Sequence, residues 1–224
     1  MTGAGRLVVF EGVEGAGKTT QLERLRAHLA RAGVACEMYR EPGGTDFGAW
    51  IRDGVLDRDW HIVPRAEAHV FMASRAQLVE TKIRPALAAG RLVLLDRFFL
   101  STYAYQVGGR GLDEAQVRAA NALATDGLVP DLTILLELPA RLGLSRAEYR
   151  GPKDRIERAG PEFLQNVADA FALFARPGWQ AAHPEAGPIV PVNAVGSPQE
   201  VEERVLRVFA ARLPDVAAAL ELVA

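Results

Sequence analysis

The chain has 224 residues and a mass of 24.2 kDa, which fits one large domain or two small ones, and 49% of its residues are hydrophobic. A net charge of −2 and a pI of about 6.1 exclude a basic field over the whole surface, so we expect neither nucleic acid nor an anionic membrane as a partner. The single cysteine, Cys36, cannot form an internal disulfide. Because no run approaches about 20 apolar residues and no signal region opens the chain, we expect a cytoplasmic protein.

The first predicted element is a strand over residues 7–10, which leads into a glycine-rich loop and then a helical period. Gly12, Gly17, Lys18 and Thr19 fill the pattern G-x-x-x-x-G-K-T, and in this strand–loop–helix context the pattern indicates a phosphate-binding P-loop. The alternative is a chance glycine turn before an ordinary helix, and the three context elements argue against it. The candidate phosphate-binding residues are Gly12, Val13, Glu14, Gly15, Ala16, Gly17, Lys18, Thr19 and Thr20.

Four further apolar runs predict strands at residues 34–40, 92–95, 132–138 and 189–192. Helical periods separate these runs, including a long one over residues 65–89. Strands that alternate with helices are typical of a mostly parallel sheet covered by helices on both faces. We therefore expect one α/β domain over the whole chain, with the three-layer P-loop NTPase fold and a five-stranded parallel sheet.

Charged side chains stand where the predicted strands end. Arg40 and Glu41 follow the second strand, Asp96 and Arg97 end the third, and Glu137 lies near the end of the fourth. Ligands of such folds bind at the carboxyl ends of the strands. Two of these ends supply an arginine, which suggests a second anion beside the phosphate on the P-loop.

A charged stretch over residues 146–158 is a candidate lid. Closing such a segment would exclude water and bring guanidinium groups onto a transferring phosphoryl group. A solvated charged hairpin fits the composition equally well. The cationic side chains of residues 146–158 are Arg146, Arg150, Lys153, Arg155 and Arg158, and Gly151 and Pro152 interrupt this segment.

Several sequence segments together resemble those of bacterial thymidylate kinases, in the same order and over essentially the whole chain. These are FEGVEGAGKTTQ, REPGGT, RAQL after an aromatic residue, DRF followed by STYAYQ, the DRIE of the lid and PDLTILLEL. The resemblance implies transfer of the γ-phosphoryl group of ATP to dTMP with Mg²⁺, giving ADP and the dTDP needed for dTTP synthesis. It also implies a homodimer. The acceptor oxygen is already ionised near neutral pH, so catalysis needs positioning and charge neutralisation and no general base.

The resemblance implies a role for each polar residue around the phosphates. Lys18 and the loop amides would hold the ATP phosphates, and Thr19 and Asp96 would hold Mg²⁺. Arg97 would bridge the donor and acceptor phosphates, and Arg40 would grip the phosphate of dTMP.

The resemblance also implies a base pocket. Phe71 would stack on thymine, and Arg75, one helical turn later, would hydrogen-bond its carbonyl edge. Thr102 and Gln106 would make further contacts with the base edge. Tyr105 would crowd the 2′ position of the sugar and disfavour ribonucleotides. Without the resemblance, a core position for Phe71 would be the better interpretation.

Members of this family place a catalytic arginine either in the P-loop or in the lid. Gly15 occupies the P-loop position here, so the chain resembles the bacterial type with a lid arginine. Arg150 is the best match for that arginine and Arg146 the second, whereas Arg155 is predicted to be structural. Glu14 matches the acid that contacts the nucleotide sugar and orients the acceptor.

Two rival functions stay open at this point, of which the nearer is a kinase for another small acceptor, such as a different monophosphate or a deoxyribonucleoside. A nucleoside kinase would need a carboxylate base near the accepting hydroxyl group, and Glu11 or Glu41 could serve. A nucleotide-dependent switch or partner-binding module would bind nucleotide and turn it over slowly. The absence of a guanine-reading N-K-x-D stretch counts against a switch of the GTPase kind, as do the DRF segment and the lid.

Overall fold

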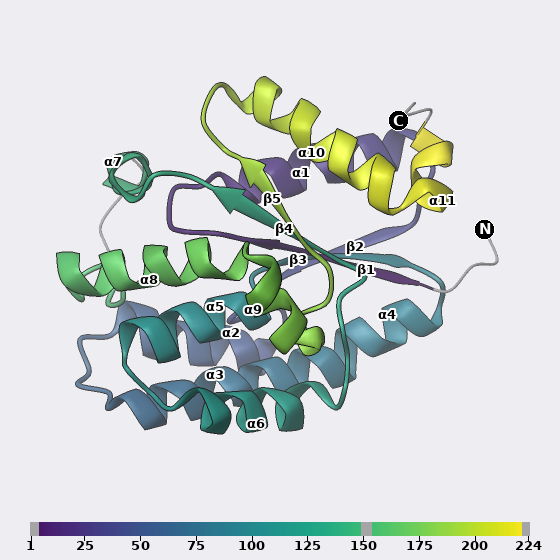
Figure 1. Cartoon of the computed structure of the whole chain (residues 1–224). Coiled ribbons are helices and arrows are strands. Elements are labelled where there is room, and N and C mark those ends of the chain that lie inside the picture. Colours follow the sequence, from purple (N-terminus) through teal and green to yellow (C-terminus); the bar gives the residue numbers. More distant parts are fainter. Residues whose placement is uncertain (1–4, 149–153, 221–224) are drawn as a thin grey trace.

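Five parallel strands form the sheet of this computed structural model, which describes residues 5–148 and 154–220 of the chain (Figure 1). The strands are β1 (Arg6–Glu11), β2 (Cys36–Arg40), β3 (Leu92–Asp96), β4 (Leu132–Glu137) and β5 (Ile189–Asn193). Their order in the sheet is β2-β3-β1-β4-β5, and each neighbouring pair is parallel. Phe10 and Arg40 both pair with Asp96, so the carboxyl ends of β1, β2 and β3 meet at one edge. The predicted five-stranded parallel sheet is confirmed.

Helices cover both faces of the sheet, which confirms the three-layer prediction. Side chains alternate along β1, so that Leu7 and Val9 pack into one core and Val8 and Phe10 into the other. The second core lies under α1 (Lys18–Arg31), α10 (Pro198–Arg212) and α11 (Pro214–Ala217), at the top of Figure 1. The opposite face carries α2 (Asp46–Arg52), α3 (Pro64–Leu78), α4 (Arg84–Ala88), α5 (Phe99–Thr102), α6 (Glu114–Thr125), α8 (Pro161–Phe174) and α9 (Pro177–Ala182).

The long predicted helix over residues 65–89 is present, but it is divided. A π-helical turn over Val79–Ile83 separates α3 from α4. Pro85 stands at the start of α4, and its missing N–H group removes one bond from the helical ladder, which the widened turn accommodates. Two further such turns follow α2, over Asp53–Asp57, and α5, over Tyr103–Gly109. The latter forms part of the wall of the cavity described below.

The C-terminal part of the chain follows local signals closely. Ser197 and Glu200 form the predicted capping box at the start of α10. The predicted apolar stripe of α8, which includes Phe163 and Phe171, is buried. The short helices α9 and α11 were not predicted, because each is too brief to show a period. In the described ranges, no helix has the length and apolar character needed to cross a membrane.

Candidate active site

The loop between β1 and α1 has the backbone that its glycines predict. Gly15 has φ 72°, and a Cβ atom there would lie 2.1 Å from the carbonyl oxygen of Gly143, so a side chain is excluded. Gly17, with φ 91°, is the N-cap of α1. The free N–H groups at this helix start and along the loop are a ready binding site for phosphate.

Lys18 lies over this loop. Its Nζ donates to the carbonyl oxygens of Gly12 at 2.8 Å and Val13 at 2.9 Å. Burial, together with the nearby charge of Arg97, lowers the pKa of Lys18 to about 8. The ammonium group is therefore held where the outer phosphates of a nucleotide would replace the two carbonyl oxygens.

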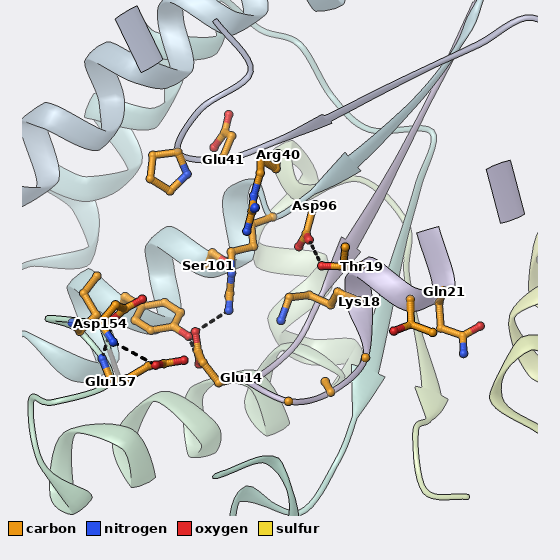
Figure 2. A pocket seen from close by; sticks show the side chains of 18 of the residues that line it. Glu14, Lys18, Thr19, Gln21, Arg40, Glu41, Asp96, Ser101, Asp154 and Glu157 are labelled. Carbon is orange, nitrogen blue, oxygen red and sulfur yellow. Dashed lines mark hydrogen bonds and ion pairs between the residues drawn. The ribbon is translucent and has the colours of Figure 1, made fainter. Parts of the chain in front are cut away.

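Thr19 and Asp96 bring two oxygen ligands together beside the P-loop. The Thr19 hydroxyl donates to Asp96 Oδ2 at 2.9 Å, as Figure 2 shows. A hydroxyl and a carboxylate suit Mg²⁺, which prefers oxygen ligands and keeps several waters when it binds with nucleotide phosphates. Within the described ranges no group of three or more His, Cys, Asp or Glu residues could hold a metal by itself. The donor set thus fits a Mg²⁺ ion that arrives with a nucleotide.

The turn after β3 holds Arg97 in an unusual backbone conformation. Arg97 has φ 72°, a left-handed value that L-residues with side chains rarely adopt, and such strain concentrates at functional sites. Buried Glu11 stabilises the turn, because its carboxylate accepts from the backbone N–H of Phe98 at 2.7 Å and of Ser101 at 3.1 Å. It also accepts from the Ser101 hydroxyl at 2.6 Å.

The Arg97 side chain reaches across to the P-loop. Its Nη1 donates to Ser101 Oγ at 3.0 Å and its Nη2 to Glu14 Oε1 at 2.6 Å. The Tyr105 hydroxyl donates to the other oxygen of Glu14, and the Arg97 guanidinium lies 5.3 Å from the centre of the Tyr105 ring. Burial alone would raise the pKa of Glu14, but the charges of Arg97 and Lys18 outweigh it, and that pKa is lowered. Burial opposes the charge of Arg97 too, yet Glu14 holds the pKa of Arg97 above its ordinary value.

A cavity of about 520 Å³ joins the P-loop to the ends of β2 and β3. Figure 2 shows Lys18, Thr19 and Asp96 on the P-loop side of this cavity and Arg40 at the end of β2. Gly12 and Val13 are not among the lining residues, and their carbonyl groups bind Lys18 instead. The predicted site residues that line the cavity are Glu14, Gly15, Ala16, Gly17, Lys18, Thr19, Thr20, Arg40, Phe71, Arg75, Asp96, Arg97, Thr102, Tyr105, Gln106 and Arg146.

Sequence reasoning missed Arg52, which also lines the cavity. Arg52 lines the same cavity as Arg40 and Arg97, and burial together with the charges of these two arginines lowers the pKa of Arg52. Three guanidinium groups around one cavity favour the binding of an anion there. Arg52 lies in a helix with no motif around it, so the sequence carried no signal for its role.

Arg75 is buried, with 3% of its surface exposed, and protein acceptors take all five of its N–H groups. Nε and Nη2 donate to Glu41 Oε2 at 2.8 and 2.5 Å. The remaining acceptors are Thr102 Oγ1, Asn121 Oδ1 and the carbonyl oxygen of Phe98. The guanidinium is thus fixed at the cavity wall.

Of the two candidate lid arginines, the structure describes only Arg146. Arg146, in α7 (Ala140–Glu148), donates to the carbonyl oxygens of Ala194 at 3.3 Å and Gly196 at 3.4 Å, in the loop after β5. Arg150 lies outside the described residues. The second half of the lid is anchored by Arg155, whose Nε donates to the carbonyl oxygen of Val55 at 2.6 Å.

Comparison with known proteins bears directly on this site. The family model for thymidylate kinase matches residues 10–184. A thymidylate kinase of Deinococcus radiodurans is 44% identical over 201 residues, which cover 90% of this chain and 94% of that protein. One from Synechococcus sp. (strain JA-2-3B'a(2-13)) is 45% identical over 207 residues, covering 92% and 95%. One from Carboxydothermus hydrogenoformans is 45% identical over 172 residues, covering 77% and 85%. The chain therefore belongs to the thymidylate kinase family.

Proposed function

We propose that this protein transfers the γ-phosphoryl group of ATP to dTMP and releases dTDP and ADP. The observation that carries the proposal is one cavity that unites a P-loop with a second cluster of arginines and a pocket lined by Phe71 and Gln106. A donor nucleotide and a nucleoside monophosphate can bind there with their phosphates facing each other across Arg97. In-line transfer between them needs positioning and charge neutralisation, which these groups supply.

On the donor side, the P-loop amides and Lys18 bind the phosphates of ATP. Thr19 and Asp96 would hold Mg²⁺, which neutralises charge on the β- and γ-phosphate oxygens when it is bound. Arg97 is fixed between Ser101 and Glu14 before any substrate arrives. Such preorganised donors act without reorganising during the reaction.

On the acceptor side, Arg40 and Arg52 bind the phosphate of dTMP. Arg40 lines the cavity, and within the described residues its side chain forms no hydrogen bond or ion pair, so its donors are available. Phe71 stacks on the base. Glu14 and Tyr105 border the sugar, where the tyrosine ring leaves little room for a 2′-hydroxyl group.

The nucleoside-kinase alternative is not supported by the positions of its candidate bases. Glu11 is fully buried, and its carboxylate is bonded to the turn after β3. Glu41 lines the cavity, but its Oε2 pairs with Arg75, and its Oε1 is buried without a hydrogen-bond partner among the described residues. Neither carboxylate presents an exposed, unpaired oxygen to a substrate hydroxyl, as a general base must.

The catalytic arginine of the lid is assigned by motif, with Arg150 first and Arg146 second. Arg150→Ala should lower kcat by orders of magnitude and change the KM for dTMP little, because a lid arginine acts mainly in the transition state. A change in KM alone would move the assignment to Arg146. A homodimer completes the proposal on the strength of the family resemblance, and a cytoplasmic location stays a prediction from the sequence.

The deciding experiment is an ADP-release assay with MgATP and a panel of acceptors. The panel contains dTMP, dUMP, UMP, dCMP, AMP, GMP, free thymidine and no acceptor. We expect strong turnover with dTMP, less with dUMP and almost none with UMP. Turnover of thymidine but not dTMP, or turnover that ignores the acceptor, would refute the proposal. Lys18→Ala is the control that should abolish transfer while the fold is retained.

A further inference from the structure

Glu67 is a buried carboxylate that the reaction described above does not use. It lies in α3 with 0% of its surface exposed. It precedes Phe71 by four residues and Arg75 by eight, so the three side chains share one face of the helix. Glu67 therefore stands behind the part of the cavity where the base is proposed to bind.

The Glu67 carboxylate accepts hydrogen bonds from three side chains. Oε1 accepts from Gln106 Nε2 at 3.1 Å and from Arg110 Nε at 3.0 Å. Oε2 accepts from Arg110 Nη2 at 3.0 Å and from Nη2 of Arg155. Burial alone would raise the pKa of Glu67, but the bonds from Arg110 and Arg155 outweigh it and lower that pKa. The group is therefore ionised, and it can only accept.

This acceptor fixes the orientation of the Gln106 side chain. An amide carries donors on Nε2 and an acceptor on Oε1, so the bond to Glu67 turns Nε2 toward the helix. Gln106 lines the cavity, and in the described part of the chain no donor is bonded to its Oε1. The bond to Glu67 thus leaves Oε1, an acceptor, at the end of the amide that is turned away from Glu67.

An acceptor at this place distinguishes pyrimidines by their chemistry. The edge of thymine or uracil presents an N3–H donor between two carbonyl oxygens. The edge of cytosine presents a lone pair on N3, which faces an amide oxygen unfavourably. A site that hydrogen-bonds one group of a substrate rejects an analogue that lacks the group, because its own buried polar atom then stays unpaired.

We propose that Glu67 is a positioning residue for base selection, which holds the Gln106 amide so that its oxygen faces N3–H of thymine and excludes cytosine. This inference rests on the proposed function, since it concerns the same acceptor site. Glu67 itself does not touch the substrate. It acts through Gln106, and the two bonds from Arg110, one to each oxygen, keep the carboxylate in place.

The test uses Glu67→Asp, which keeps the charge but withdraws the carboxylate by about 1.5 Å, one C–C bond. The long side chains of Arg110 and Arg155 can follow the shorter acid, whereas the buried Gln106 cannot. We expect the KM for dTMP to rise about tenfold and the ratio of kcat/KM for dTMP over dCMP to fall about tenfold, with kcat nearly unchanged. A ratio within about twofold of the wild-type value overturns the proposal.

Arg155→Met is the matched control, because it removes a different bond of the same carboxylate. It should leave the dTMP to dCMP ratio unchanged. Gln106→Met should lose the discrimination between dTMP and dCMP. Adding Glu67→Asp to this variant should not lower the ratio further, because the two residues act as a unit. If Glu67→Asp lowers the dTMP to dCMP ratio in Gln106→Met by the same factor as in the wild type, Glu67 does not act through Gln106.

A measurement on the wild-type protein needs no change at Glu67. The side-chain NH₂ signal of Gln106, assigned by its loss in Gln106→Met, should show one proton that exchanges slowly with water, with and without dTMP. Fast exchange of both protons overturns the inference. If wild-type protein does not phosphorylate dTMP at all, the proposed function fails. If it does and the Glu67→Asp ratio is unchanged, only the present inference fails.

Discussion

The low pKa of Lys18 predicts that ATP binding depends on pH between 7 and 9. With a pKa of about 8 in the free protein, Lys18 is about 90% charged at pH 7 and about 10% charged at pH 9. Bound phosphate favours the charged form and raises that pKa. Since the charged form binds ATP, the association constant should fall about tenfold from pH 7 to pH 9.

Calorimetric titration of ATP into the wild-type protein measures this coupling directly. At pH 8 about half of the protein must take up a proton at Lys18 on binding, so buffers of different ionisation enthalpy should report an uptake of about 0.5 proton per ATP. Lys18→Met is the control, with weak binding that has no such pH dependence. Proton uptake near zero at pH 8, or equal affinities at pH 7 and pH 9, would refute the assignment of Lys18.

The effect of Lys18 on the stability of the free protein has the opposite sign. Its folded pKa of about 8 lies below the ordinary 10.5, so the unfolded chain binds more protons between these values. The contribution of Lys18 to the free energy of unfolding therefore rises as pH increases from 8 to 10.5. The shift corresponds to on the order of 3 kcal/mol, which the difference between wild type and Lys18→Met should reveal in urea titrations across this window.

Three further substitutions distinguish a residue that acts in the reaction from residues that stabilise the fold. Arg97→Lys should lower kcat about 10²- to 10³-fold without lowering the melting temperature, because lysine cannot donate to two groups in the fork geometry; a kcat within a few-fold of wild type would contradict its role. Glu11→Ala should lower the free energy of unfolding by about 1–3 kcal/mol for each donor left unpaired, and unchanged urea midpoints would contradict this. Phe209→Ala should cost about 3–5 kcal/mol in the core under α10 and leave KM unchanged, and a large change in KM would argue against a purely structural position.

Local sequence patterns predicted the strands and the P-loop because the conformation of these segments depends on residues close together in the chain. The apolar run at Leu7 predicts a strand buried on both faces, and the structure places alternate residues in two cores. The P-loop was predictable because Gly12, Gly15 and Gly17 have backbone angles that few other residues adopt. The ends of β2 and β3 then follow from the parallel sheet, which brings Arg40 beside Asp96.

Contacts between distant segments could not be predicted in this way. Glu67 receives its partners from positions 39, 43 and 88 residues further along the chain. A helical period does not distinguish a buried glutamate from a solvated one. Composition alone left open whether Arg155 belongs to a lid or to a solvated charged hairpin. The convergence of Arg52 with Arg40 and Arg97 is likewise a product of packing.

The motif match and the hydrogen bonds of Arg75 give different information about its role. The motif match expects this side chain to contact the base, and the structure does place it on the cavity wall. However, its five N–H groups already have acceptors, so a base carbonyl would have to share one of them. Thr102 Oγ1 accepts from Arg75 at 2.8 Å and therefore has its own hydrogen to donate. Within the described residues no acceptor is bonded to that hydroxyl, so we expect Thr102 to donate to a base at this wall and Arg75 to fix where the hydroxyl points.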